Sequence, residues 1–279
     1  MRSIAVINQK GGVGKTTTAV NLSAALAEAG QRVCLMDLDP QAHASLHLGI
    51  ALKEGEKSIY DVLTSDTPFS EVRRDVTSKL SIFPAHLDLA AAEMELAGEV
   101  GREVILRDKL TEYLGEFNSP PFDFIIMDCA PSLGVLTLNA LTAVDEVFLP
   151  LQPHFLALHG LSKLLRTIDI VAQRLNPTLR LSGVVLCMYE SGTRLAAEVT
   201  SDVEEFFSRR NSSSVWSRAQ NFTTRIRRNI RLAEAPSFGQ SIFDYAPQSH
   251  GADDYRRLAR EVLGLSLEDS LPHVSAQSA

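Results

Sequence analysis

The stretch Asn8 to Thr17, which reads NQKGGVGKTT, decides the fold of this chain. Phosphate-binding loops follow the pattern G-x-x-x-x-G-K-[ST], in which backbone N–H groups hold phosphates and the hydroxyl binds Mg²⁺. The second half of the stretch matches this pattern through Gly14, Lys15 and Thr16. Gln9 replaces the first glycine, and a second lysine, Lys10, comes before the other glycines. The stretch therefore predicts a phosphate-binding loop with one additional lysine.

The residues around this loop predict a strand before it and a helix after it. Ser3 to Ile7 is a short apolar run typical of a buried parallel strand, and Thr16 to Ala29 has apolar residues at helical spacing. Gly30 is expected to end the helix. A helix N-terminus presents unpaired N–H groups and a positive dipole end, which together stabilise an anionic phosphate.

Each residue of the loop has an expected role toward a bound nucleotide. Lys15 is expected to contact the β- and γ-phosphates, Thr16 the metal, and Thr17 the α-phosphate. Glycines let the backbone approach the phosphates because they carry no Cβ. The complete set of expected nucleotide-binding residues in the loop is Lys10, Gly11, Gly12, Val13, Gly14, Lys15, Thr16 and Thr17.

Short apolar runs alternate with amphipathic segments along the rest of the chain. The predicted strands are Ser3–Ile7, Val33–Asp37, Leu80–Pro84, Phe122–Asp128, Glu146–Pro150, Leu181–Met188 and Asn221–Thr224. The main predicted helices between them are Ala90–Ala97, Glu103–Phe117, Val135–Ala143, Leu158–Leu175, Leu195–Arg210 and Ala252–Leu263. This alternation predicts an α/β fold of the P-loop NTPase kind: a single doubly wound, mostly parallel sheet with helices on both faces. We expect one domain over residues 1–265 and a flexible tail over 266–279.

Two aspartates follow predicted strands, at the edge of the sheet where functional loops gather. Asp128 ends the apolar run FIIM, and Asp39 lies two residues beyond the strand Val33–Asp37. Because Mg²⁺ keeps several waters and takes only one or two carboxylates, Asp128 beside the phosphate loop is the expected carboxylate of a metal site. Asp39 is expected to orient the attacking water. With Lys10 and Lys15, Asp39 completes the predicted catalytic set.

Composition favours a large cytoplasmic domain. The chain has 279 residues, 45% of them hydrophobic, which is enough for a sizeable core. We find no apolar run long enough for a membrane span, and the first strand begins too early for a signal peptide. Cys34, Cys129 and Cys187 are widely spaced in apolar contexts, so we expect reduced core thiols.

Five segments of the chain resemble ParA-type ATPases, and the short chromosomal Soj kind in particular. They are KGGVGKTT at Lys10 to Thr17, DLDPQA at Asp37 to Ala42, FIIMDCAPSLG at Phe124 to Gly134, LTLNAL at Leu136 to Leu141, and IRLAEAPSFGQSI at Ile230 to Ile242. The resemblance implies a deviant P-loop ATPase that forms a homodimer with ATP and Mg²⁺ held between the subunits. It also implies that Lys10 reaches the partner's phosphates and that a ParB/Spo0J-like protein activates hydrolysis.

A basic segment predicts contact with the DNA backbone although the chain carries a net charge of −7. Residues 206–233 contain seven arginines and no acidic residue, and the rest of the chain holds 20 basic against 34 acidic residues. A basic patch on an acidic body is typical of a sequence-independent phosphate binder. The DNA-binding candidates are Arg218, Arg225, Arg227 and Arg231. Where this chain has Arg227, the family usually has proline, and Arg228 and Asn229 are candidates to face the adenine instead.

Three other functions use the same kind of loop. A MinD-like membrane ATPase requires a basic amphipathic C-terminal helix, whereas LGLSLEDSLPHVSAQSA contains no Lys or Arg. An iron–sulfur electron carrier requires two suitably placed cysteines, and Cys129 has no such partner. Positioning of another cargo by the same ATP-dependent, nucleoid-associated cycle remains an alternative to chromosome or plasmid segregation.

Overall fold

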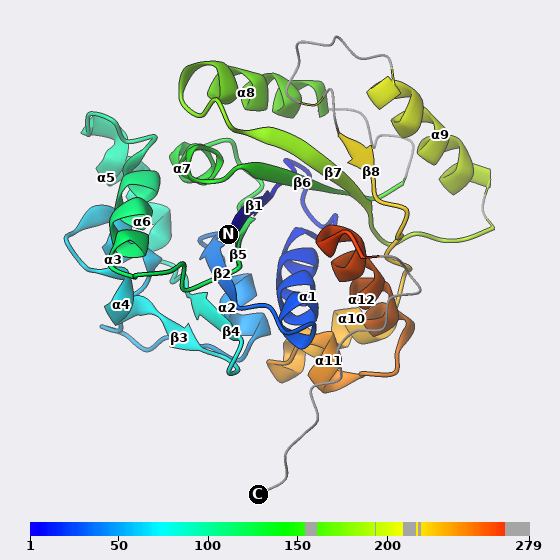
Figure 1. Ribbon diagram of the computed structural model, residues 1–279, viewed down its shortest axis with the longest axis horizontal. Coiled ribbons are helices and arrows are strands. Elements are labelled where there is room, and N and C mark those ends of the chain that lie inside the picture. Colours follow the sequence, from blue (N-terminus) through cyan, green and yellow to red (C-terminus); the bar gives the residue numbers. More distant parts are fainter. Residues whose placement is uncertain (154–160, 193, 209–215, 217–218, 266–279) are drawn as a thin grey trace, which may run out of the picture.

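The computed structural model describes residues 1–153, 161–192, 194–208, 216 and 219–265. Within this part of the chain, eight strands form one sheet in the order β3-β4-β2-β5-β1-β6-β7-β8 (Figure 1). The strands are β1 (Arg2–Val6), β2 (Val33–Leu38), β3 (Arg74–Asp75), β4 (Leu80–Phe83), β5 (Phe124–Cys129), β6 (Glu146–Leu151), β7 (Arg180–Leu186) and β8 (Gln220–Asn221). β3 pairs antiparallel with β4, and the other neighbouring strands pair in parallel. The predicted α/β fold with a mostly parallel sheet is confirmed.

Helices cover both faces of the sheet (Figure 1). One face carries α1 (Lys15–Glu28) and α12 (His250–Leu263), and the opposite face carries α6 (Ile105–Gly115), α7 (Val135–Ala143), α8 (Leu161–Arg174) and α9 (Arg194–Ser208). The shorter elements are α2 (His43–His47), α3 (Ile59–Thr64), α4 (Phe69–Val72), α5 (Leu89–Glu95), η1 (Leu96–Gly98), α10 (Ile230–Glu234), η2 (Ala235–Phe238) and α11 (Ile242–Tyr245). No described helix is long and apolar enough to cross a membrane.

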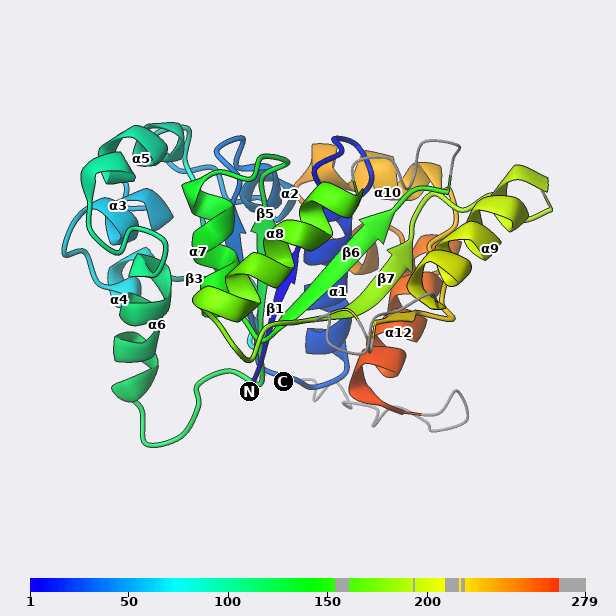
Figure 2. The same cartoon turned by 90° about the horizontal axis from the view of Figure 1, so that it is seen from above.

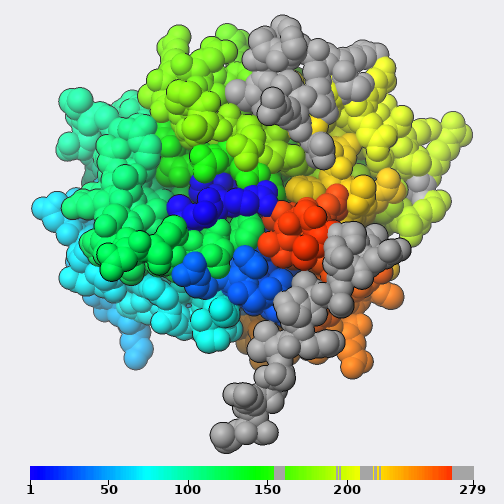
Figure 3. Space-filling view, in the orientation of Figure 1, coloured from blue at the N-terminus to red at the C-terminus, as the bar shows by residue number. Residues whose placement is uncertain are grey.

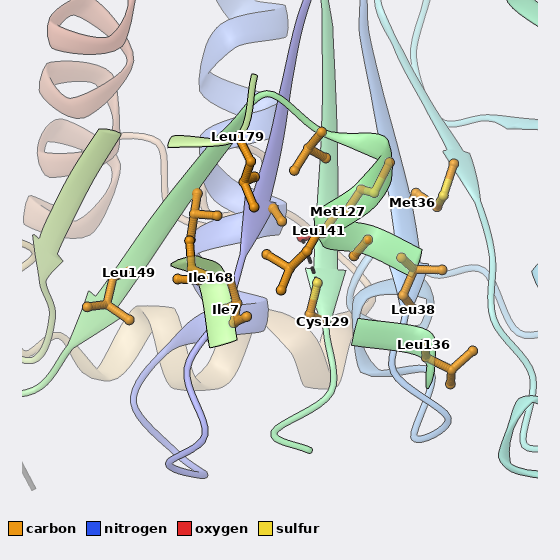
Figure 4. Packing of buried hydrophobic residues seen from close by; sticks show 14 of the residues in the cluster. Ile7, Met36, Leu38, Met127, Cys129, Leu136, Leu141, Leu149, Ile168 and Leu179 are labelled. Carbon is orange, nitrogen blue, oxygen red and sulfur yellow. Dashed lines mark hydrogen bonds between the residues drawn. The ribbon is translucent and has the colours of Figure 1, made fainter. Parts of the chain in front are cut away.

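A hydrophobic core fills the space between each face of the sheet and its helices. Figure 4 shows part of the core beneath α7 and α8, where Met127 of β5 and Leu149 of β6 lie near Leu141 and Ile168 from the two helices. All four side chains have no solvent exposure. The central strands are apolar on both faces because helices cover both of them, as in other parallel sheets.

The order of the strands positions the phosphate loop. β1 lies between β5 and β6, so the chain leaves β1 through α1 in one direction and later leaves β5 through α7 in the other. In open α/β sheets, ligands bind at the carboxyl ends of the strands where the direction changes. The loop after β1 reaches this edge beside α2 and α10 (Figure 2).

Both ends of the described chain meet at the opposite edge of the sheet. In Figure 3 the first residues, in dark blue, lie beside the last helix, in red. Arg2 Nε donates to Glu146 Oε1 at 2.8 Å, and the Arg2 guanidinium also bonds the carbonyl of Val262 in α12. This contact ties the first strand to the last helix.

The structure differs from the sequence prediction mainly in its short elements. Strand β3 was not predicted because it is only two residues long, too short for any periodic pattern. The same holds for α3, α4, α10 and α11, none of which exceeds six residues. The three cysteines are free and buried, as predicted. The predicted tail, residues 266–279, lies outside the described residues, so the domain limits stay a prediction.

Candidate functional site

The loop between β1 and α1 presents the N-terminus of α1 to the pocket. Gly14 caps this helix in the left-handed conformation, with φ of 93°, which favours glycine because it has no Cβ. No side chain caps the first turn of α1. Unpaired N–H groups and the positive dipole end therefore face the ligand side of the loop, as the sequence predicted.

The two lysines of the loop lie in different environments. Lys15 is buried and its Nζ donates to the carbonyl of Lys10 at 3.2 Å, which places the ammonium across the loop. Burial lowers the pKa of Lys15, while Asp128 and Asp39 oppose this effect. Lys10 is exposed, and its ammonium makes no hydrogen bond or ion pair with any residue that the structure describes.

Asn8 holds the start of the loop in place. Its Nδ2 donates to the carbonyl of Pro150 at the end of β6, at 2.7 Å, and its Oδ1 accepts from the N–H of Lys10 at 3.0 Å. The side chain thus ties the lysine-bearing end of the loop to a neighbouring strand. The sequence analysis missed this role because the partner strand lies 142 residues away in the chain.

The carboxylate of Asp128 is fully buried near the end of β5. It has no solvent exposure, and neither of its oxygens receives a hydrogen bond of normal geometry from a described residue. Burial and the neighbouring carboxylate of Asp37 raise its pKa well above the ordinary value, while Thr16 and Lys15 act in the opposite direction. A buried carboxylate without partners is costly for a fold unless a cation or donor joins it.

The residues present fit a magnesium site of the kind that completes its shell with phosphate oxygens and water. In such a site Asp128 would supply the carboxylate, and Thr16 at the start of α1 would supply the hydroxyl. Among the described residues, no group of three or more His, Cys, Asp or Glu side chains could hold a metal by itself. Mg²⁺ usually binds through one or two carboxylates plus substrate phosphates, so this sparse set suits it.

Asp37 is a buried carboxylate that the sequence analysis did not select. It lies opposite Asp128 in the pairing of β2 with β5. Its Oδ2 accepts from the N–H of Ser45 at 2.8 Å and from the Ser45 hydroxyl at 2.7 Å, which anchors α2 to the end of β2. Burial raises the pKa of Asp37 to about 6. In the sequence, the feature that could have identified Asp37 as a site residue is its position at a strand end next to Asp39.

Asp39 lies at the pocket wall, as its position beyond the strand predicted. It is 8% exposed, and its Oδ1 accepts from the N–H of Gln41 at 2.9 Å. Its own N–H donates to Asp37 Oδ1 at 3.2 Å. The turn therefore holds the Asp39 backbone while its carboxylate borders the pocket.

The loop, Asp39 and the segment 226–233 surround one cavity of about 700 Å³. Its lining residues are Gly11, Gly12, Gly14, Lys15, Thr16, Thr17, Asp39, Gln41, His43, Pro131, Cys187, Met188, Ile226, Arg227, Arg228, Asn229, Ile230, Leu232, Ala233 and Tyr255. The phosphate loop lines one part of the cavity, and the segment 226–233, which combines Ile226 and Leu232 with Arg227, Arg228 and Asn229, lines another. Of the predicted nucleotide-binding residues, Lys10 and Val13 do not line this cavity. Val13 is buried instead, at 2% exposure.

Acidic residues lie beside several arginines of the arginine-rich segment, residues 206–233. Arg228 Nη1 donates to Glu190 Oε1 at 3.0 Å, and Arg231 Nη1 donates to Glu234 Oε2 at 2.8 Å. Arg227 pairs with Asp254 of α12, and Asn229 caps α10 by accepting from the N–H of Arg231.

Arg225 stacks on a tyrosine ring. Its guanidinium lies over the ring of Tyr189, 4.5 Å from the centroid, and donates to the hydroxyl at 2.7 Å. Arg218 lies outside the described residues. The arginine-rich segment contains no acidic residue up to Ala233, but in the folded chain acidic side chains lie beside its arginines.

Known proteins resemble this chain in sequence and in structure. The matching family model is described as an AAA domain and covers residues 1–181. The chain is 45% identical over 260 residues to the sporulation initiation inhibitor protein Soj of Bacillus subtilis, covering 93% of this chain and 97% of that protein. It is 44% identical over 263 residues to the chromosome partitioning protein ParA of Myxococcus xanthus, covering 94% of this chain and 88% of that one.

A solved structure adds a likeness in three dimensions. A protein of Mycobacterium smegmatis, described as cobyrinic acid a,c-diamide synthase with bound ATP analogue and magnesium, is 37% identical with a TM-score of 0.78, covering 94% of each chain. The fold, the phosphate loop and these likenesses agree. The chain belongs to the Soj and ParA family of chromosome-partitioning ATPases.

Proposed function

We propose that this protein is an ATP-dependent dimerising switch that binds DNA without sequence specificity and hydrolyses ATP slowly to drive chromosome or plasmid segregation. The cavity beside the phosphate loop takes ATP, with the phosphates at the N-terminus of α1. A ParB/Spo0J-like partner activates hydrolysis, and the ATP-bound form associates with the nucleoid. Relatives named Soj and ParA support this proposal.

In the proposed reaction, Lys15 and the N–H groups of the loop bind the phosphates. When bound with ATP, Mg²⁺ would neutralise charge on the β- and γ-phosphates, and Asp128 and Thr16 would hold its shell. Asp39 orients the attacking water from the pocket wall. Arg228 and Asn229 also line the cavity, and they are the proposed residues facing the adenine.

The observation that carries the dimer proposal is the position of Lys10. Its side chain is exposed and does not line the cavity, although Lys15, five residues later, is buried within the site. A lysine that does not serve its own nucleotide can neutralise phosphate charge in a second subunit, as an arginine finger does. Dimerisation would then depend on the γ-phosphate, and hydrolysis would loosen the dimer.

DNA binding is proposed through Arg218, Arg225, Arg227 and Arg231, doubled across the dimer. Arg231 keeps 53% of its side chain exposed beside Glu234, whereas Arg227 keeps 37% beside Asp253 and Asp254. Exposed pairs contribute little and yield to phosphate readily, so Arg231 is the more available of the two.

The proposal is tested by DNA retention in the presence of ATP, ADP or no nucleotide, with the oligomeric state measured in parallel. We expect salt-sensitive retention and a dimer with ATP, and neither with ADP. Equal retention in all three conditions would contradict a nucleotide-controlled switch. Dimerisation without DNA retention would leave the ATPase switch and remove the DNA part of the proposal.

A further inference from the structure

Two adjacent residues of α12 connect this helix to the two ends of the cavity. Asp254 bonds Arg227, which belongs to the segment 226–230 that lines the cavity apart from the phosphate loop. The next residue, Tyr255, places its hydroxyl 3.2 Å from Thr18 Oγ1 in the first turn of α1. α12 thus contacts both the segment 226–230 and α1, the helix that follows the phosphate loop.

The contact between Arg227 and Asp254 is two-pronged and largely enclosed. Arg227 Nη2 donates to Asp254 Oδ1 at 2.7 Å, its Nε donates to the same oxygen at 3.0 Å, and its backbone N–H donates to Oδ2 at 2.9 Å. Asp254 is 3% exposed. Planar guanidinium–carboxylate pairs of this kind fix direction as well as distance.

The backbone of the same segment is held on its other side by the chain that follows β7. The N–H of Ile226 donates to the carbonyl of Leu186 at 2.8 Å, and the N–H of Arg228 donates to that of Tyr189 at 3.2 Å. Both anchors act on backbone that lines the cavity from Ile226 to Ile230. Losing the α12 anchor would leave the segment attached but free to shift its position.

We infer that Arg227 and Asp254 are positioning residues that hold the segment 226–230 against the base of the bound nucleotide and thereby set nucleotide affinity. This inference rests on the proposed binding of ATP in the cavity. Arg227 acts through the backbone that it fixes, and Asp254 acts through Arg227. The phosphate loop is tied to α12 separately, through Thr18 and Tyr255, so the two ends of the cavity depend on different contacts.

The separation between the two ends gives a direct test with two ligands. ATP needs both ends of the cavity, whereas inorganic tripolyphosphate with Mg²⁺ uses only the phosphate end. For Asp254→Asn we expect ATP affinity to fall about tenfold, which corresponds to about 1.4 kcal/mol, with tripolyphosphate affinity unchanged. In steady-state hydrolysis, KM should rise while kcat at saturating ATP stays the same, because the catalytic groups are untouched.

A second variant and a matched control complete the experiment. Arg227→Gln should reproduce the selective loss, and its partial exposure makes loss of folding unexpected. Glu28→Gln removes another two-pronged contact of α12, from Arg256 at 2.6 and 2.8 Å, but Glu28 does not line the cavity. This control should leave both affinities unchanged.

Three outcomes would overturn the inference. Equal losses for ATP and tripolyphosphate in both variants would show a general structural role, and unchanged ATP affinity would show no role. A fall in kcat without a rise in KM would place the pair in the chemical step. If the parent protein binds neither ATP nor tripolyphosphate, the proposed function fails first, which distinguishes the two failures.

Discussion

At the scale of single residues, we propose that the two lysines of the phosphate loop have different roles, one in binding ATP and the other in dimerisation. For Lys15→Ala we expect loss of ATP binding, because the variant removes the buried ammonium of the phosphate loop that is proposed to bind the phosphates. For Lys10→Ala we expect ATP binding to persist and the ATP-dependent dimer to disappear, because we propose that the exposed ammonium serves the partner's nucleotide. Equilibrium binding of ATP and sedimentation with a non-hydrolysable analogue measure the two effects separately. A Lys10→Ala variant that remains dimeric would refute the cross-subunit role.

The carboxylate of Asp39 is expected to matter for hydrolysis and not for binding. Groups that orient or activate a nucleophile contribute about a hundredfold or more to the rate, so Asp39→Ala should lower kcat by at least that factor. The variant should keep ATP, remain dimeric and stay on DNA. Phosphate release under single-turnover conditions measures the rate, and Glu99→Ala, an exposed acid on another segment, is the control. Ordinary turnover by Asp39→Ala would exclude Asp39 from catalysis.

At the scale of elements, α2 and η2 approach each other through two glycines. A Cβ on Gly239, at the end of η2, would lie 2.9 Å from the Cα of Gly49, just after α2, and the φ of Gly239 is +65°. α2 also carries Ser45, the partner of Asp37, so this contact supports one wall of the site. The close approach therefore links a turn after η2 to the edge of the cavity.

We expect Gly239→Ala to destabilise the fold more than Gly264→Ala does. Both positions have positive φ, which costs about 1–2 kcal/mol for alanine, but no heavy atom of the described chain lies within 4 Å of a Cβ on Gly264. Crowding against the Gly49 backbone should add about 1–3 kcal/mol. The free energy of unfolding in urea measures both variants. Equal losses would show that the backbone of α2 moves away without cost.

At the scale of the whole molecule, charge is distributed unevenly between a basic segment and an acidic body. For Arg225→Glu we expect weaker DNA retention and a salt dependence reduced by about one lost phosphate contact, with unchanged ATP affinity, since Arg225 does not line the cavity. Filter binding across a salt series checks this. Arg166→Glu in α8 makes the same change of charge on an exposed position elsewhere and is the control. Equal effects of the two changes would point to net charge rather than a patch.

Much of the fold could be predicted because its signals are local. Val33–Met36 is a continuous apolar run within β2, and α7 matches the predicted Val135–Ala143, since apolar patterns report burial directly. The loop at residues 8–17 was predictable because phosphate binding needs particular residues at particular spacings. The two-residue strand β3 and the helices of four to six residues were not predicted, because they are shaped by their neighbours and not by their own periodicity.

The sequence by itself determined the phosphate loop, the parallel sheet, the positions of Asp39 and Asp128 at strand ends, and the family. Only the tertiary structure decided which side chains meet: it pairs Asp37 with Ser45, ties Asn8 to Pro150 and sets Arg227 against Asp254. It also showed that Lys10 lies outside the cavity that encloses Lys15. The physical reason is distance along the chain. Motifs and periodicity act over a few residues, whereas burial, charge pairing and cavity shape depend on segments that only folding brings together.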